Sequence, residues 1–418
     1  VPDVSSSVSH TTPSTGPDGL RYASRLDLLS GEGALDVLLR ARELERAGRD
    51  VVHLEIGEPN FATPEHIVEA GIAALHRGET HYGPPAGIPE LREAIVAAGA
   101  SRGIAATADQ VVVTPGAKPA VFYAIMSLVS PGDEVLVPDP GFPIYPSATR
   151  FAGGTPVGYP LDPAERYAID VDALAARITP RTRVLIVNAP HNPTGGSIDQ
   201  PTIDRIAELA EAHDLAVISD EIYARLTYDE RGAPAVPAPS LAAHPALRPR
   251  TLLVDGFSKT YAMTGWRLGY LVVPPSLVSR VTTLAINGHT CTPEFVQRAG
   301  IAALTGPAEP IRRMHAELAA RRQVLVGGLA EIPGVRCAPP PGAFYAFADF
   351  SELLARTGLT ATELASRMLQ EHGVAALAGT AFGAGGEGHL RLSFAGARAE
   401  LERAIPRIRE CATALGAR

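Results

Sequence analysis

The chain has 418 residues, 46% of them apolar and 20% charged, and its formal net charge is −8. This composition is ordinary for a soluble globular protein, and the length suits two domains or one large domain with a smaller cap. The acidic balance, without any basic run, gives no sign of a nucleic-acid partner. No apolar run reaches the roughly 18 residues that a membrane span needs, so we expect no membrane partner either.

Three further features of the sequence limit the kind of protein that this chain can be: its cysteines, its histidines and its N-terminus. Cys291, Cys337 and Cys411 are widely spaced and form no Cys-x-x-Cys pair, which argues against a disulfide framework or a zinc site and indicates a cytoplasmic protein. The 12 histidines include no His-Glu-x-x-His pattern, so we expect no catalytic metal. Residues 1–19 are rich in Ser, Thr and Pro, and they predict a disordered leader.

Three helices and a short strand are expected in the first part of the chain. Apolar residues recur at helical spacing over 34–47, and residues 50–56 then have the pattern of a strand. Prolines mark the starts of two further helices, at 64–75 and 89–100.

The middle of the chain alternates strands with helices. Strands are expected at 111–114, 134–138, 184–188, 216–219, 251–254 and 269–273. Helices are expected at about 119–129, 170–176 and 202–213. Continuous apolar strands separated by helices predict a mostly parallel sheet sandwiched by helices, with ligand bound beyond the carboxyl ends of the strands.

The pattern changes after about residue 305. A surface loop at 231–250 precedes that point, and a long charged helix to about 329, strands near 343–348 and 390–394 and a final helix follow it. With the N-terminal segment, these elements predict a smaller α+β domain. The chain is therefore expected to be an α/β protein with a large domain at 61–304 and a small domain made of 20–60 and 305–418.

Residues 255–270 hold the reactive candidate, Lys259, in a polar stretch between two expected strands. Of the 37 lysine and arginine residues, two are lysine, at 118 and 259, and 35 are arginine. Arginine stays protonated and cannot form a Schiff base, whereas a lysine amine with a lowered pKa can attack a carbonyl. The retained lysine therefore indicates a nucleophile; the alternative is a biased codon usage that spared two lysines.

Polar residues follow other expected strands in the same way. Residues 114–119 join a strand to a helix through Gly116, a turn that suits a phosphate but is also an ordinary connection. Asn192 lies in a loop made rigid by two prolines and a glycine, and its amide can donate to a ring hydroxyl or a carboxylate. Asp220 ends an apolar strand, where it either meets a cation such as a protonated pyridine or caps a helix.

Two arginines complete the set. Arg267 follows Lys259 by eight residues and could pair with phosphate, and Arg391 lies in an alternating strand, where its guanidinium could bind a carboxylate through two hydrogen bonds. With 35 arginines in the chain, surface exposure is the alternative for each.

In order and spacing, the motifs Ser258-Lys259-Thr260, Gly265-Trp266-Arg267, Asn192-Pro193-Thr194-Gly195 and Ser219-Asp220-Glu221-Ile222-Tyr223 resemble those of the fold-type I pyridoxal-phosphate enzymes. Specifically, from about residue 34 to the C-terminus the chain is similar to the class I/II aminotransferases related to aspartate aminotransferase. The resemblance implies a pyridoxal 5'-phosphate-dependent transaminase acting on an amino acid and a 2-oxo acid. A pyridoxal-phosphate lyase, cyclase or decarboxylase is the alternative, and a non-enzymatic regulator is disfavoured.

The resemblance also assigns roles to residues. It implies that Lys259 carries the cofactor as a Schiff base and moves the proton at the substrate's α-carbon, with Asp220 on the pyridine nitrogen and Tyr223 on the ring oxygen. The further residues that it places on the cofactor are Gly116, Ala117, Lys118, Phe142, Asn192 and Arg267. Tyr82 matches the tyrosine that reaches the phosphate of a neighbouring subunit, which implies a homodimer with shared sites.

Substrate binding is assigned in the same way. The resemblance places the α-carboxylate on Arg391, Asn192 and the backbone of Gly57. No arginine stands at 287–291, where some aspartate aminotransferases bind the distal carboxylate. One subgroup uses a lysine that matches Lys118 for that purpose, so we expect an acidic donor, aspartate or glutamate.

Two more positions depart from the family pattern. Gly256 replaces a phosphate-binding serine that many relatives have, so one contact to the phosphate is missing or supplied elsewhere. Phe142 replaces a tryptophan or tyrosine, which keeps the stacking surface but loses a hydrogen-bonding edge.

Overall fold

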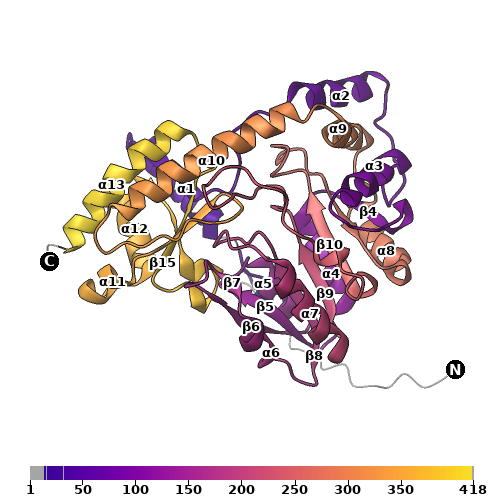
Figure 1. Ribbon diagram of the computed structural model, residues 1–418, viewed down its shortest axis with the longest axis horizontal. Helices are drawn as coiled ribbons and strands as arrows, with labels where there is room; N and C mark the ends of the chain where they lie inside the picture. Colours follow the sequence, from indigo (N-terminus) through magenta and orange to yellow (C-terminus); the bar gives the residue numbers. More distant parts are fainter. Residues whose placement is uncertain (1–13, 16, 32, 417–418) are drawn as a thin grey trace.

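The computed structural model describes residues 14–15, 17–31 and 33–416, and its elements form two groups (Figure 1). Within the expected leader, Ser14–Thr15 forms β1 and pairs with β2 (Arg21–Tyr22), whereas residues 1–13 and 16 lie outside the described residues. In the described ranges, no helix is both long and apolar enough to cross a membrane.

An eight-stranded sheet forms the centre of the first group, in the order β4-β11-β10-β9-β8-β5-β6-β7. Neighbouring strands from β10 to β6 are parallel, β11 is antiparallel to both of its neighbours, and β7 is antiparallel to β6. The expected mostly parallel sheet is confirmed. The strands are β4 (Val111–Thr114), β5 (Glu134–Asp139), β6 (Thr155–Asp162), β7 (Ala168–Ile169), β8 (Thr182–Asn188), β9 (Ala216–Asp220), β10 (Thr251–Gly256) and β11 (Gly269–Val272).

Helices cover both faces of this sheet, and alternate strand residues face opposite layers. Val112 and Val254 lie on the face packed by α4 (Ala117–Leu128), α5 (Ile144–Phe151) and α8 (Val278–His289). Val113 and Leu253 face the other side, with α2 (Glu65–His76), α3 (Pro89–Ala100) and α9 (Glu294–Thr305), and farther along β8 that side is packed by α7 (Gln200–Ala212). Since both faces of the sheet are buried, the sequences of its strands are continuous apolar runs. The short α6 (Val171–Ala175) packs beside α7.

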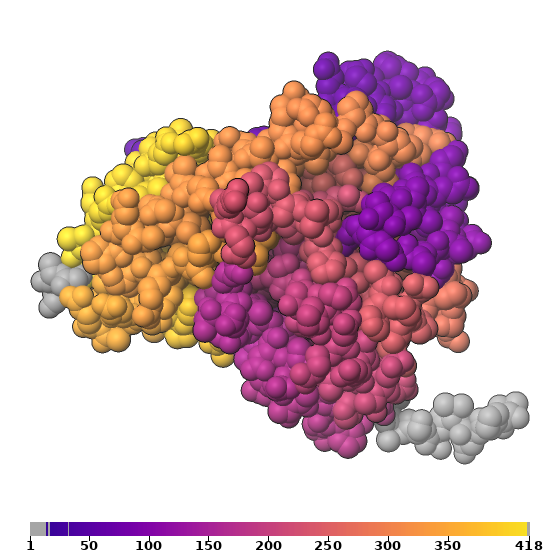
Figure 2. Space-filling model, in the orientation of Figure 1, coloured from indigo at the N-terminus to yellow at the C-terminus, as the bar shows by residue number. Residues whose placement is uncertain are grey.

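The second group surrounds a three-stranded antiparallel sheet, β12-β15-β14. The strands are β12 (Tyr345–Asp349), β14 (Leu377–Ala378) and β15 (His389–Ser393), and one apolar core joins them to α10 (Glu309–Ala330), α11 (Ser351–Thr357), α12 (Ala361–His372) and α13 (Arg398–Gly416). The N-terminal α1 (Gly33–Arg46) and β3 (Val52–His53) pack here too, because β3 pairs with β13 (Val374–Ala375). Figure 2 shows the orange surface of α10 reaching from the yellow C-terminal helices toward the purple surface of α2.

Two expectations differ from the structure in detail. The strand expected over 50–56 is shorter, at Val52–His53. Leu54 still makes backbone hydrogen bonds with Ala375 and Ser393, but the carbonyls of Glu55 and Gly57 accept hydrogen bonds from side chains instead of from a strand. The loop at 231–250 contains two short 3-10 helices, and Leu241 and Leu247 are buried in it, so it lies on the surface only in part.

Candidate active site

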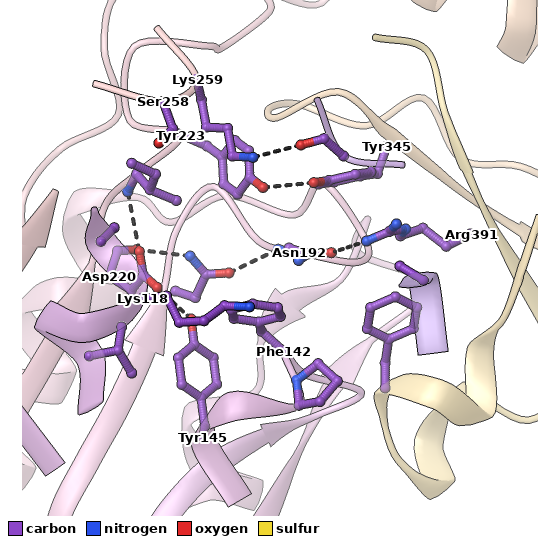
Figure 3. A pocket seen from close by; sticks show the side chains of 18 of the residues that line it. Lys118, Phe142, Tyr145, Asn192, Asp220, Tyr223, Ser258, Lys259, Tyr345 and Arg391 are labelled. Carbon is purple, nitrogen blue, oxygen red and sulfur yellow. Dashed lines mark hydrogen bonds between the residues drawn. The ribbon is translucent and has the colours of Figure 1, made fainter. Parts of the chain in front are cut away.

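A cavity of about 270 Å³ lies beyond the carboxyl ends of the parallel strands, between the two groups of elements (Figure 3). The large sheet contributes Asn188 and Asp220 from the ends of β8 and β9. The second group contributes Tyr345 and Arg391 from β12 and β15. This is the position that the order of strands and helices predicts for a ligand.

Lys259 enters the cavity from the loop that follows β10. Its Nζ donates a hydrogen bond to the carbonyl oxygen of Gly57 at 2.6 Å. Burial lowers the pKa of Lys259 from 10.5 to about 8, and the charges of Arg391, Arg267 and Lys118 lower it too, against an opposing effect of Glu58. An amine with this pKa is partly unprotonated near neutral pH, so it can act as a nucleophile or a base.

Asp220 lies at the end of β9 and is 4% exposed. The hydroxyl of Tyr145 donates to its Oδ2 at 2.8 Å, and the backbone N–H of Ile222 donates to its Oδ1 at 3.3 Å. Burial raises the pKa of Asp220 to about 6. A buried carboxylate whose donors are neutral groups fits a cationic ligand atom, such as a protonated ring nitrogen, that enters the cavity above it.

An anion cradle lies at the N-terminus of α4. Gly116 caps this helix with a φ of 103°, and a Cβ built there would lie 2.5 Å from Nη2 of Arg267. The guanidinium of Arg267 therefore packs against the backbone turn, and its Nη1 donates to the Thr264 carbonyl at 2.8 Å. Arg267 itself has a φ of 55°, an uncommon backbone conformation for a residue with a side chain. Helix N–H groups beside a guanidinium fit a phosphate.

Arg391 is 4% exposed on the opposite wall. Its Nη1 donates to Oδ1 of Asn192 at 3.0 Å, and its Nη2 donates to the carbonyl oxygen of Glu55. The guanidinium carbon lies 4.4 Å from the ring centroid of Tyr345. These contacts hold the guanidinium in place, and a guanidinium can bind a carboxylate through two hydrogen bonds.

Aromatic rings and a second lysine complete the walls. The Nζ of Lys118 lies 5.6 Å from the ring centroid of Phe142. The hydroxyl groups of Tyr223 and Tyr345 are hydrogen-bonded at 2.7 Å, and burial raises the pKa of Tyr223 well above its usual value. Figure 3 shows Lys118, Phe142, Tyr223 and Lys259 around the same cavity. Among the described residues, the lining thus combines apolar surface with four basic side chains, Lys118, Lys259, Arg267 and Arg391, and one buried carboxylate, that of Asp220.

The structure brings most of the predicted residues together. Those that line the cavity are Gly57, Ala117, Lys118, Phe142, Asn192, Asp220, Tyr223, Lys259, Arg267 and Arg391. Gly116 contacts the cavity wall through Arg267, whereas Tyr82 is 89% exposed and lies outside the cavity in the described chain. At Gly256, a Cβ would meet the backbone of Gly269 at 3.1 Å, so the position is crowded by β11.

Several lining residues were not predicted. Asn188 ends an expected strand and Ser258 precedes Lys259, so both had a signal in the sequence. Tyr345 lies in an expected strand, but its pattern does not show that its hydroxyl meets Tyr223. Tyr145 had no signal, since α5 was not expected.

Comparisons with known proteins agree with this geometry. The family model of aminotransferase class I and II matches residues 49–408. The aspartate aminotransferase of Geobacillus stearothermophilus is 37% identical over 93% of this chain and 98% of its own length. An arginine–pyruvate transaminase of Pseudomonas aeruginosa is 37% identical over 95% of this chain and 99% of its own. The solved structure of Thermus thermophilus aspartate aminotransferase with maleate superposes with a TM-score of 0.85 at 36% identity, and the match covers 93% of this chain and 99% of that one.

Proposed function

Because the chain belongs to the class I and II aminotransferases and is a pyridoxal-phosphate-dependent transaminase, we propose that it transfers the amino group of aspartate or glutamate to a 2-oxo acid. The observation that carries the acidic preference is the presence of a further basic side chain, Lys118, in the cavity that also holds Arg391. An acidic amino acid has two carboxylates, and each would have its own positive group. The names of similar enzymes, among them an aspartate/prephenate aminotransferase of Thermus thermophilus, support this class of substrate.

The cofactor would be held by the residues around Asp220 and the α4 N-terminus. When bound, pyridoxal phosphate accepts the electrons released at the substrate's α-carbon. Asp220 would keep a proton on the ring nitrogen, and Tyr223 and Asn192 would hydrogen-bond the ring oxygen. Phe142 would stack on the ring, and the phosphate would lie between Arg267 and the backbone of Gly116 and Ala117, with Lys118 nearby.

Lys259 is the proposed catalytic base. Its amine is buried, and a pKa of about 8 leaves part of it unprotonated at neutral pH. It would take a proton from the α-carbon and later return one. Arg391, helped by Asn192 and the Gly57 backbone, would hold the α-carboxylate so that this carbon faces the amine, and Lys118 would bind the far carboxylate.

We also propose a homodimer with shared sites. Tyr82 and six leucines in the segment from residue 20 to residue 39 are candidates for the interface. Their side chains are aromatic or apolar, yet they are exposed to solvent in the single chain. The exposed fractions are 89% for Tyr82, 67% for Leu20, 49% for Leu26, 44% for Leu28, 40% for Leu29, 54% for Leu35 and 56% for Leu39. Tyr82 would reach the phosphate of the partner subunit. Within each chain, we propose the division into a large domain at 61–304 and a small domain at 20–60 and 305–418.

Chemical trapping tests the assignment of Lys259. Borohydride reduction of the cofactor-loaded protein fixes the cofactor on the amine that carries it, and peptide mass analysis then locates it. Because the chain has two lysines, the outcome is unambiguous. We expect the added mass on the peptide that contains Lys259, and added mass on Lys118 or on neither lysine would contradict the proposal.

The two lysines also provide a matched pair of variants. Lys259→Ala should lower kcat for every donor by about 10⁴-fold, because the general base is lost. Lys118→Ala should raise KM about tenfold or more for aspartate and glutamate, since a hydrogen bond to a charged group is lost, and should leave KM for alanine unchanged. An equal rise in KM for alanine would contradict the proposal that Lys118 binds the far carboxylate of the substrate.

A further inference from the structure

The segment between β3 and the cavity carries two contacts to the proposed active-site residues. The carbonyl oxygen of Glu55 accepts a hydrogen bond from Nη2 of Arg391, and that of Gly57 accepts one from Nζ of Lys259. Backbone hydrogen bonds to Gly373, Ala375 and Ser393 hold this segment as far as Leu54, so the residues from Glu55 to Gly57 depend partly on side chains for their position. Contacts that fix the position of this segment therefore also fix the positions of the Arg391 guanidinium and the Lys259 amine.

His53 and Glu55 form an ion pair at the base of that segment. The Nδ1 of His53 lies 2.7 Å from Oε1 of Glu55, and its Nε2 lies 3.1 Å from Oε1 of Glu45 on α1. The side chain of Glu55 is fully buried, and its Oε2 has no hydrogen-bond partner in the part of the chain that the structure describes. A buried carboxylate is costly without a charged partner, and the imidazolium of His53 is that partner.

We propose that His53 is a positioning residue for substrate binding: by pairing with Glu55, its imidazolium holds residues 53–57 so that their carbonyls orient Arg391 and Lys259. This inference rests on the roles proposed above for those two side chains. His53 itself touches neither the cavity wall nor the reacting atoms, so it acts through the backbone. Without its partner charge, the buried carboxylate of Glu55 would be poorly stabilised where it lies, and a turn of this side chain toward water would shift the backbone that carries its carbonyl.

The pair should respond to pH through the proton on His53. The hydrogen bond from Glu55 raises the pKa of His53 from 6.5 to about 9, against an opposing effect of burial and with a smaller contribution from Glu45. On the adjacent helix α13, Arg403 and Arg407 are paired with Asp50 rather than with this group. Since the pKa is raised in the folded protein, the stabilisation is complete below about pH 6.5 and is lost as the pH rises through about 9.

Steady-state kinetics of His53→Gln across pH test the proposal. Below pH 8 we expect KM for the amino donor to rise about tenfold with a smaller change in kcat, because a hydrogen bond to a charged group is lost. Above pH 9 the ratio of variant to wild-type KM should approach one, since wild-type His53 has then lost its proton. The ratio cancels the titration of Lys259 and of the substrate. His53→Lys, which keeps a positive charge at pH 10, should keep KM at pH 10 near the value that wild type has below pH 8.

A double variant supplies a readout that does not depend on turnover. His53→Gln alone leaves the Glu55 carboxylate buried without its charge, whereas His53→Gln with Glu55→Gln removes the charge as well. In thermal unfolding of the cofactor-free protein at pH 7, we therefore expect the single variant to have a lower Tm than the double variant. Glu45→Gln, at the exposed end of the pair, and His76→Gln, at the exposed end of α2, are the matched controls and should change neither Tm nor KM appreciably.

The outcomes separate this inference from the proposed function. If wild-type protein turns over an acidic donor but His53→Gln has the wild-type KM at every pH, the positioning role of His53 is overturned. A double variant less stable than the single one would overturn the positioning role as well. That result would mean that His53 does not act by compensating the buried charge of Glu55. If wild-type protein turns over no acidic donor, or Lys259 carries no cofactor, the proposed function itself fails, whatever the Tm values of the variants show.

Discussion

Asp220 shows how burial at one residue can prepare chemistry. The carboxylate is nearly inaccessible and its hydrogen-bond donors are the Tyr145 hydroxyl and a backbone N–H. In the cofactor-free chain its negative charge is therefore poorly compensated, and burial raises its pKa from 3.8 to about 6. A protonated ring nitrogen would supply the missing positive charge, so the proposed cofactor and the fold would stabilise each other.

Replacing Asp220 separates stability from activity. Because its pKa is raised in the folded state, ionisation costs stability, and this cost appears as the pH rises from about 4 through 6. Asp220→Asn removes it, so we expect the cofactor-free variant to gain about 3 kcal/mol over wild type at pH 8, and less at pH 5. Turnover should fall about 10³-fold, because the ring nitrogen loses its charged partner. Urea unfolding at the two pH values and a steady-state assay measure both effects; a gain that does not grow with pH would contradict the account.

The sequence predicts much of the site at this scale, and its failures have a physical origin. Lys259 was identified because its chemistry cannot be performed by arginine, which the chain otherwise prefers. Asn192 and Asp220 were predicted from motifs that follow or end expected strands, and Arg391 from its place within an alternating strand; the structure places all three around one cavity. Tyr145 and the hydrogen bond between Tyr223 and Tyr345 were not, because they depend on which side chains meet across 75 and 122 residues of chain.

Among the elements, β11 and the N-terminus of α4 approach each other closely at the site. A Cβ at Gly269 would lie 2.5 Å from the backbone N of Ala117 and 2.5 Å from the backbone C of Gly116. Those atoms are backbone atoms of the proposed phosphate cradle. A side chain at residue 269 would therefore have to push this turn away from β11 and so distort the cradle. The strand can approach the turn this closely because residue 269 has no side chain.

Gly269→Ala should therefore damage the cradle. We expect it to destabilise the protein by about 2 kcal/mol through overpacking and to lower the amount of cofactor that stays bound after dialysis. Gly265→Ala is the matched control, since among the described residues no atom lies within 4 Å of a Cβ built there, and its effect should stay within about 0.5 kcal/mol. Thermal unfolding and the bound-cofactor ratio provide the comparison, and equal behaviour of the two variants would refute the close-approach argument.

Elements were predictable to the extent that local sequence determines them. The parallel strands were found because burial on both faces leaves continuous apolar runs bounded by turns. Helix α8 was missed because Val278, Val281, Thr282, Thr283 and Ile286 are β-branched and lower helix propensity, so packing against the sheet decides its structure. Helix α5 was missed because of Pro146, which is tolerated in its first turn.

On the scale of the whole molecule, the cavity depends on both groups of elements. The sheet supplies Asp220 and, through the loop after β10, Lys259, while the second group supplies Arg391 and the Gly57 backbone. The hydrogen bonds from Lys259 to Gly57 and from Arg391 to Asn192 cross between these groups. The family and the α/β fold follow from motifs and their order, whereas the pairing of the two groups rests on long-range packing that no single segment encodes.

The proposed dimer predicts the mass of the particle in solution. Light scattering coupled to size exclusion should give the mass of two chains for wild type. The combined variant Leu35→Asp and Leu39→Asp, which charges two exposed positions of α1, should shift the mass toward one chain because burying unpaired carboxylates at an interface is unfavourable. Val236→Asp alters a similarly exposed position in the 231–250 loop and should leave the mass unchanged. A wild-type mass of one chain would reject the shared site.

The absorption spectrum of the purified protein, followed while amino acids are added one at a time, tests the central claim most directly. We expect an absorption band from bound pyridoxal phosphate. Low concentrations of aspartate or glutamate should replace this band by the shorter-wavelength band of the aminated cofactor, and a 2-oxo acid should restore the first band. Conversion by a non-acidic amino acid alone would contradict the assignment of Lys118 and Arg391 to two carboxylates. A protein that shows no band after loading with pyridoxal phosphate would contradict the assignment of Lys259.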